Sequence, residues 1–211
     1  MQQVDLARIC GADGVFVISH HGNDDELVQV AAVAKGLYPD FKIGINLLSE
    51  GALTACKKAA DAKLDMVWAD DMGVDSTGGN TMADSLSRFA REFPAIQLFA
   101  SVAFKYRPHE PNPSLAAKNA QQLGFVPTTS GSATGSAPEV QKIVDMHLAT
   151  DGQLAIASGM SPENVSDFAP YLSHILVATG VGLDEHRIDP QKLNQLIVNS
   201  KAAPTHEEHP R

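Results

Sequence analysis

The stretch GFVPTTSGSATGSAPEVQKIVDMHLA, residues 124–149, shows the unit from which the whole chain is built. An apolar run comes first, a turn of glycine and hydroxyl residues (130–136) follows, and a segment with helical spacing of apolar residues completes it. Glycine lets the backbone of such a turn approach a ligand, and a helix N-terminus presents unpaired N–H groups that favour an anion. Ser136 and Glu139 have the spacing of a capping box, which predicts where the helix begins. The turn therefore indicates either an anion site or a polar strand–helix connection without a ligand.

The same strand–helix unit recurs along the chain. Apolar runs begin near residues 14, 42, 65, 96, 124, 153 and 174, on average about 27 residues apart, with helix-like segments between them. Most of these runs are continuously apolar, which is typical of parallel strands covered on both faces. We therefore expect an α/β fold of the TIM-type (β/α) barrel class, with an open doubly wound sheet as the alternative.

The sequence shows seven such units, whereas a (β/α) barrel has eight strands and about 250 residues. Because the chain opens with a helix-like segment over residues 1–10, the unit that is missing is the first strand. Either that strand is absent from this sequence, or the barrel closes in some other way. We expect one barrel domain over residues 1–200 and a disordered, charged tail over residues 201–211.

The composition narrows the classes of partner. The 211 residues are 44% hydrophobic and 19% charged, which is typical of a soluble globular protein. A net charge of -9, without a cluster of lysine and arginine, argues against nucleic acid or an anionic membrane surface as partner. No apolar stretch is long enough for a membrane span, and no signal peptide opens the chain. Cys10 and Cys56 lack metal-ligand spacing, so we expect reduced core thiols in a cytoplasmic protein.

In either fold, ligands bind beyond the carboxyl ends of the strands. Three turns that follow apolar runs combine glycine with hydroxyl residues, and three such turns on one rim favour an anion more than any one of them does. The predicted phosphate-binding residues are Gly131, Ser132, Thr134, Gly135, Ser158, Gly159, Thr179 and Gly180.

The catalytic candidates follow four other apolar runs. Lys105 could pair with a phosphate, form a Schiff base or act as a base, or simply extend to water. Asp70 could be a general base or one carboxylate of a Mg²⁺ site, or it could cap a helix. Asn46 could bind a substrate hydroxyl or amide, or pin a loop. His20 completes the set, and because the His20-His21 pair lacks the third ligand of a zinc site, no metal site is predicted.

Six segments resemble the BtpA family in the same order along nearly the whole chain: GADGVFVISHHGND, KIGINLL, LFASVAFKYRP, TSGSATG, ASGMSPENV and ILVATGVGLDEHRIDPQKL. TSGSATG followed by SGMSPENV is the most specific part. The family is related to the phosphate-binding (β/α)8 barrels. Its members have been linked to photosystem I biogenesis in cyanobacteria, although the family is widespread in organisms that do not photosynthesise. The resemblance implies a barrel with a ligand-binding rim rather than a particular reaction.

The chain also departs from the pattern of that family. Ser19 and His20 stand where family members usually carry an acidic residue and an asparagine, and Ser101 and Ala103 stand where they usually carry Asp and His before Lys105. These differences affect acid–base chemistry and leave the anion site intact. We expect a barrel that binds a small phosphorylated sugar or nucleotide-like metabolite and acts as an isomerase, lyase or glycosyl-transfer enzyme. The alternative is a non-catalytic assembly or stability factor with a photosystem-biogenesis-like role, which forms a homo-oligomer or binds a partner at an open barrel edge.

Overall fold

The computed structural model describes residues 1–20, 22–184 and 186–203. Its centre is a sheet of seven strands in the order β1-β2-β3-β6-β7-β8-β9, in which every neighbouring pair is parallel. The strands are β1 (Gly14–Ile18), β2 (Lys42–Asn46), β3 (Met66–Ala69), β6 (Gln97–Ser101), β7 (Val126–Thr129), β8 (Ala155–Ala157) and β9 (His174–Leu176). The spatial order follows the chain order and never reverses, so the barrel expectation is confirmed and the doubly wound alternative is wrong.

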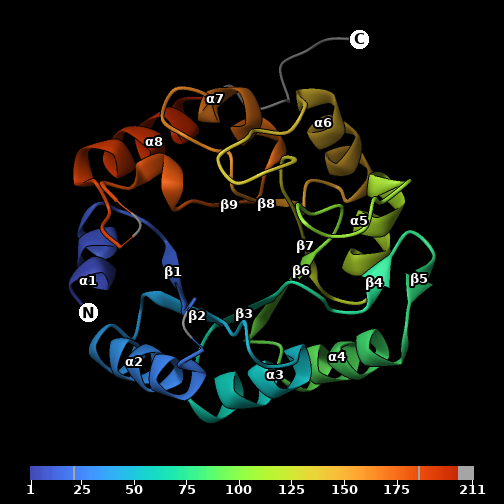
Figure 1. Ribbon diagram of the computed structural model, residues 1–211, viewed down its shortest axis with the longest axis horizontal. Helices are drawn as coiled ribbons and strands as arrows, with labels where there is room; N and C mark the ends of the chain where they lie inside the picture. The colour runs from blue at the N-terminus through green and yellow to red at the C-terminus, as the bar shows by residue number, and fades with distance from the viewer. Residues whose placement is uncertain (21, 185, 204–211) are drawn as a thin grey trace.

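Helices form the outer wall around this curved sheet (Figure 1). They are α1 (Gln2–Ile9), α2 (Asp24–Leu37), α3 (Ala52–Asp61), α4 (Thr81–Glu92), α5 (Pro113–Gln122), α6 (Val140–Ala149), α7 (Val165–Phe168) and α8 (Pro190–Ala202), with short 3-10 turns η1 (Ala169–Tyr171) and η2 (Thr179–Val181). Lys201 and Ala202 thus belong to α8, while residues 204–211 of the expected tail lie outside the described residues. Within the described ranges, no helix combines the length and apolar character of a membrane span.

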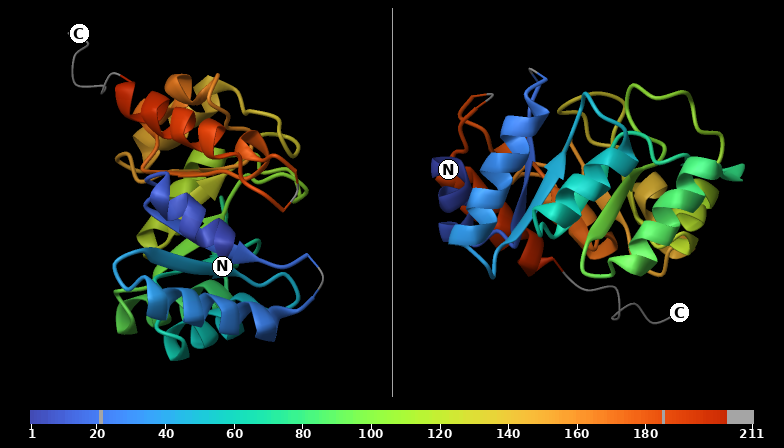
Figure 2. Two further views of the ribbon diagram at one scale, coloured as in Figure 1. Left: turned by 90° about the vertical axis from the view of Figure 1, so that its left-hand side faces the viewer. Right: turned by 90° about the horizontal axis from the view of Figure 1, so that it is seen from below.

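The sheet is open between β1 and β9, where the first strand of a complete barrel would stand. Within the described part of the chain, β1 pairs with β2 alone and β9 with β8 alone. The helical wall does not share this opening, because α1 lies between α8 and α2 on that side of the molecule (Figure 2). The backbone N–H of Ile188 donates to the side-chain oxygen of Gln3 and ties the loop before α8 to α1. The molecule is therefore a seven-stranded barrel with a continuous outer layer and a gap in its strand layer.

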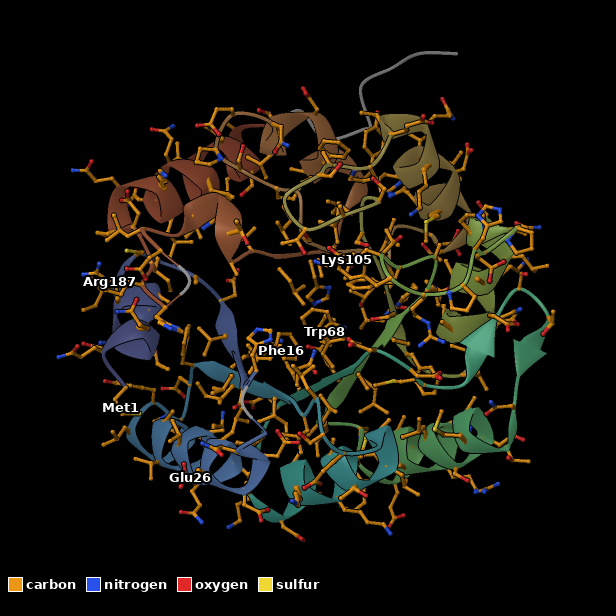
Figure 3. All side chains as sticks on the ribbon, in the orientation of Figure 1. Met1, Phe16, Glu26, Trp68, Lys105 and Arg187 are labelled. Atoms are coloured by element: carbon orange, nitrogen blue, oxygen red, sulfur yellow. The ribbon has the colours of Figure 1, made fainter. Side chains whose placement is uncertain are left out.

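The strands bury different residues on their two faces. Outward-facing side chains such as Ile45, Leu98 and Ile156 form the main core against the helices. A second, smaller cluster fills the interior: it consists of Met66, Phe99, Val126 and Ala155, with Phe16, Trp68 and Leu176 packed against it. Phe16 and Trp68 lie near the centre of the view along the barrel (Figure 3), and their ring centroids are 6.0 Å apart. Aromatic rings thus occupy the space inside the incomplete strand layer.

The structure confirms some predicted local features and corrects others. Asn112 and Asp189 cap α5 and α8 through their side chains, as the Asn-Pro and Asp-Pro pairs predict. The capping box of Ser136 and Glu139 is wrong, because α6 begins only at Val140 and its N-cap makes no side-chain hydrogen bond. Pro138 explains the delay, since the residue before a proline is disfavoured in helical conformation.

Two loops also differ from the sequence-based expectation. The glycine-rich polar segment DMGVDSTGGN after β3, which sequence composition indicates is a loop, contains a small antiparallel hairpin, β4 (Val74–Asp75) and β5 (Gly78–Gly79). The Ser161-Pro162 pair indicates a helix beginning at Pro162, but the helix begins at Val165, where Asn164 is the N-cap. The loop before it folds on itself, because the Asn164 side chain accepts from the Ser161 N–H and donates to the Gly159 carbonyl. Neither of the expected rim helices, α6 and α7, therefore starts directly at a glycine turn.

Candidate anion site at the barrel rim

The three glycine turns predicted to bind phosphate are in backbone contact with one another. A Cβ atom added at Gly131 would lie 1.9 Å from the Ser136 carbonyl oxygen, and one added at Gly159 would lie 2.4 Å from the same oxygen. A Cβ at Gly180 would lie 2.0 Å from the carbonyl oxygen of Met160. Gly131 therefore lies against the far end of its own turn, while Gly159 and Gly180 pack the turns after β8 and β9 against the turn before each, so closely that only glycine fits at the three positions.

The hydroxyl residues of these turns link them further. The Gly135 N–H donates to the Ser158 hydroxyl over 3.2 Å, which connects the turn after β7 to the turn after β8. Ser158 holds a φ of +91°, a conformation that L-residues rarely adopt. The N–H of Gly159 has no acceptor among the described residues. Ser132, Thr134 and Thr179 are exposed at the same rim. The eight predicted phosphate-binding residues thus lie on three adjoining turns.

The loop after β6 reaches the first of these turns at Thr134. Lys105 Nζ donates to the Thr134 hydroxyl over 3.2 Å, and the Lys105 N–H donates to the Ser130 hydroxyl over 2.8 Å. The Thr134 N–H donates in turn to the Tyr106 hydroxyl over 3.3 Å. Thr134 lowers the pKa of the Tyr106 phenol by hydrogen bonding, and Lys105 adds to this effect. Lys105, labelled in Figure 3, is thereby brought to the predicted anion turn.

Two residues that sequence reasoning did not select belong to this region. Tyr106 is 79% exposed and holds a φ of +63°, and the left-handed backbone that points its hydroxyl at Thr134 leaves no trace in a sequence pattern. Lys142 lies on α6, and its Nζ donates to the carbonyl oxygens of Ala103 and Ser130, each over 2.9 Å. Burial lowers the pKa of Lys142. A lysine on an amphipathic helix normally indicates a solvent-exposed position, so the sequence pattern contains no signal for the role of Lys142.

The two carboxylates after β3 have different partners. Arg107 donates to the backbone carbonyl oxygen of Asp70 and forms an ion pair of 3.3 Å with the Asp71 carboxylate. The carboxylate of Asp70 is exposed and has no ion-pair partner among the described residues. Since β3 and β6 are neighbours in the sheet, Asp70 and Lys105 stand on adjacent loops that Arg107 ties together.

Asn46 ends β2 and is buried, with 1% of its surface exposed. Neither its side-chain oxygen nor its side-chain nitrogen has a hydrogen-bond partner. Gly44, two residues earlier, would meet Phe16 and Met66 with an added Cβ, so this side of β2 faces the barrel interior. A buried amide without partners costs free energy in the folded state, which marks Asn46 as a candidate ligand contact.

His20 stands apart from the other candidates. It is exposed in the loop after the edge strand β1, and β2 and β3 separate that strand from β6. The structure therefore does not bring His20 together with Lys105. His21 lies outside the described residues. Within the described ranges, no three His, Cys, Asp or Glu side chains are grouped so that they could hold a metal ion.

Two hollows of the surface lie away from the glycine turns. One of about 230 Å³ lies between the β4–β5 hairpin and Arg107, and one of about 440 Å³ lies between α1 and α8 next to Cys10. Neither is lined by the predicted phosphate-binding residues. Backbone groups at a rim can hold a small anion without a deep pocket, so the turns remain the candidate anion site.

No protein-family model matches the chain, and no curated protein matches its sequence. Several solved structures share its fold. Phosphoribosyl anthranilate isomerase from Thermus thermophilus superposes with a TM-score of 0.68 at 15% identity, over 96% of this chain and 94% of the isomerase. Thiamine phosphate pyrophosphorylase from Pyrococcus furiosus gives a TM-score of 0.66 at 11% identity, over 95% of this chain and 88% of that one.

The 3-keto-L-gulonate-6-phosphate decarboxylase from Vibrio cholerae gives a TM-score of 0.67 at 11% identity, over 96% of this chain and 91% of the decarboxylase. At these identities the likeness shows the fold, a (β/α) barrel, and leaves the activity to be argued from the site.

Proposed function

We propose that the rim formed by the turns after β7, β8 and β9 binds the phosphate group of a small phosphorylated sugar or nucleotide-like metabolite. The observation that carries this proposal is the close backbone contact of the three turns at Gly131, Gly159 and Gly180, together with the Lys105 ammonium bonded to Thr134. Glycines leave the backbone N–H groups accessible, and a lysine supplies positive charge at the same place.

We further propose that the protein is an enzyme of the isomerase, lyase or glycosyl-transfer kind. Lys105 would neutralise negative charge that develops during the reaction, and Asp70, the carboxylate without an ion-pair partner, would move a proton. The amide of Asn46 would bind a polar group of the substrate. His20 has weaker support, since two strands separate its loop from that of Lys105. If Mg²⁺ takes part, Asp70 is its one candidate ligand among these residues.

The comparisons add support of a general kind. The names of all three barrels described above contain a phosphorylated or phosphoribosyl compound. The segments that resemble the BtpA family include the turns at residues 129–135 and 157–165, both of which lie at this rim. The two cysteines are free thiols, Cys56 being buried, which fits the cytoplasmic location that we propose.

A thermal-shift screen tests the proposed function. The panel contains inorganic phosphate, ribose phosphates, glycolytic phosphosugars and nucleotides, each with and without Mg²⁺. A binder present at 100 times its dissociation constant should stabilise the fold by about 2.7 kcal/mol. Lys105→Ala should weaken the shift, whereas Lys118→Ala, which removes the same charge from an exposed position on α5, should not. A folded protein that responds to no member of the panel would contradict the proposal.

A second candidate function follows from the open sheet. The unpaired edges of β1 and β9 offer backbone groups to an added strand, which favours a non-catalytic assembly or stability factor, or a homo-oligomer. A stoichiometric partner that co-purifies and protects the backbone amides of β1 and β9 from hydrogen exchange would support this function. A monodisperse monomer with an active anion site would contradict it.

A further inference from the structure

Lys142 occupies a position that ordinary packing does not explain. Lys142 lies on α6, and its ammonium group reaches two segments of backbone. It donates one hydrogen bond to the carbonyl oxygen of Ala103 and one to that of Ser130. Ala103 lies two residues before Lys105, and Ser130 lies directly before Gly131. A single side chain therefore joins the loop that carries Lys105 to the turn that would hold the anion.

The ammonium group of Lys142 carries an unbalanced charge. It is partly buried, and no carboxylate of the described residues forms an ion pair with it. Burial is what lowers its pKa, with no charged neighbour offsetting the effect. A cation in such a position destabilises the folded state unless an anion compensates it. The two groups that accept from it, the carbonyl oxygens of Ala103 and Ser130, are uncharged, so a bound anion is one way to supply the missing negative charge.

Fold stability alone would be served equally well by an uncharged side chain. The carbonyl oxygen of Ala103 also accepts from the Thr129 hydroxyl over 3.2 Å, so it keeps a donor when Lys142 is removed. The carbonyl oxygen of Ser130 alone would lose a partner, and that cost is offset by the removal of a poorly solvated charge. The presence of a lysine at this position is thus better explained by ligand binding than by packing.

We infer that Lys142 is a positioning residue of the anion site: its ammonium group fixes the Lys105 loop against the turn at residues 130–136, and a bound phosphate group supplies the negative charge that it lacks. This inference rests on the proposed function, and it adds Lys142 to the residues that would form the phosphate site. A ligand with a phosphate dianion should gain more from this arrangement than a monoanion of similar size, because the site presents both Lys105 and Lys142.

The test measures two quantities for each of four proteins: the affinity for inorganic phosphate and the Tm in the absence of phosphate. The proteins are the wild type, Lys142→Met, Lys142→Arg and the control Lys118→Met. Lys142→Met should bind phosphate at least tenfold more weakly, which corresponds to about 1.4 kcal/mol. Its Tm without phosphate should stay within about 4 °C of the wild type. Lys142→Arg, which keeps the charge and can bond both carbonyls, should recover most of the affinity, and Lys118→Met should bind as the wild type does.

The possible results separate the inference from the proposed function. If the wild type binds phosphate and Lys142→Met binds it equally well, the inference is wrong and the proposed function stands. If Lys142→Met loses much more stability than stated, Lys142 is a structural residue and the inference is wrong as well. A folded wild type that binds no phosphate would refute the proposed function and the role of Lys142 with it.

Discussion

Gly131→Ala should damage the anion rim more than any other single-methyl change. An added Cβ at this position would stand 1.9 Å from the Ser136 carbonyl oxygen and 2.9 Å from the Ala137 carbonyl carbon. Because real Cβ atoms essentially never come closer than 3.0 Å to such atoms, the backbone at residues 136–137 must move by at least about 1.1 Å. The same carbonyl of Ser136 packs against Gly159, so the displacement also disturbs the turn after β8.

The magnitude of this effect follows from the forced movement. Overpacking of this kind costs about 1–3 kcal/mol, which in a chain of this length lowers the Tm by about 2–12 °C. Phosphate affinity should fall at least about tenfold as the N–H groups of the two turns lose their mutual geometry. Urea unfolding followed by the fluorescence of Trp68 gives the stability, and isothermal titration with inorganic phosphate gives the affinity.

Gly36→Ala is the matched control for this experiment. Gly36 lies inside α2 with no atom within 4 Å of an added Cβ, so the same methyl group should raise the free energy of unfolding by about 0.5–1 kcal/mol and leave phosphate binding unchanged. A Gly131→Ala protein that is as stable as the wild type and binds phosphate equally well would refute the claim that these turns form one closely packed site.

Three further predictions concern the barrel interior and the rim. Asn46→Leu should raise the free energy of unfolding by about 1 kcal/mol in urea titrations, because a buried amide without partners is replaced by an apolar side chain of similar size; a loss of stability would show that the amide has a structural role. Burial lowers the pKa of His174 in the folded protein, and Lys42 contributes to this shift. Because the unfolded chain then takes up the proton more readily, the free energy of unfolding should decline as the pH falls below about 6.5. His174→Gln should therefore reduce the drop in Tm between about pH 7.5 and pH 5.5. An unchanged pH dependence in that variant would assign the effect to other groups. Arg107→Ala should weaken phosphate binding severalfold by freeing the Lys105 loop from Asp70 and Asp71, and titration with inorganic phosphate would contradict this if the affinity stayed the same.

The fold was accessible from the sequence because its signal is repeated. Each apolar run is followed by a segment with helical periodicity, and β7 with α6 is one instance of a pattern that recurs along the chain. Seven independent copies of the pattern compensate for errors at any one boundary. The same repetition indicates seven strand–helix units, and the described residues form a seven-stranded parallel sheet.

Local features that depend on a single residue were harder to predict. The capping box at Ser136 failed because Pro138 delays the start of α6, and a match to a short motif does not weigh such a neighbour. The β4–β5 hairpin has only two residues in each strand, which is too short for a periodic signal.

The residues of the rim show a different limit of prediction from sequence. Sequence reasoning selected Gly131, Gly159 and Gly180 because glycine next to hydroxyl residues is a local pattern, and the structure places their turns in contact. It missed Lys142 because the interaction of that side chain with Ala103 depends on residues 39 positions apart. It selected Asp70, but it could not foresee the ion pair between Arg107 and Asp71 that distinguishes the two carboxylates. Long-range contacts of side chains therefore decide the part of the site that patterns do not reveal.

The most direct test of the account is a titration of the ¹⁵N-labelled protein with inorganic phosphate, followed by the backbone amide resonances. The N–H resonances of Gly131, Gly135, Gly159 and Gly180 should shift together with a single dissociation constant, while those of β1 and the β4–β5 hairpin stay in place. Saturable shifts confined to other parts of the molecule, or no shifts at these four glycines, would contradict the claim that the rim is a phosphate site.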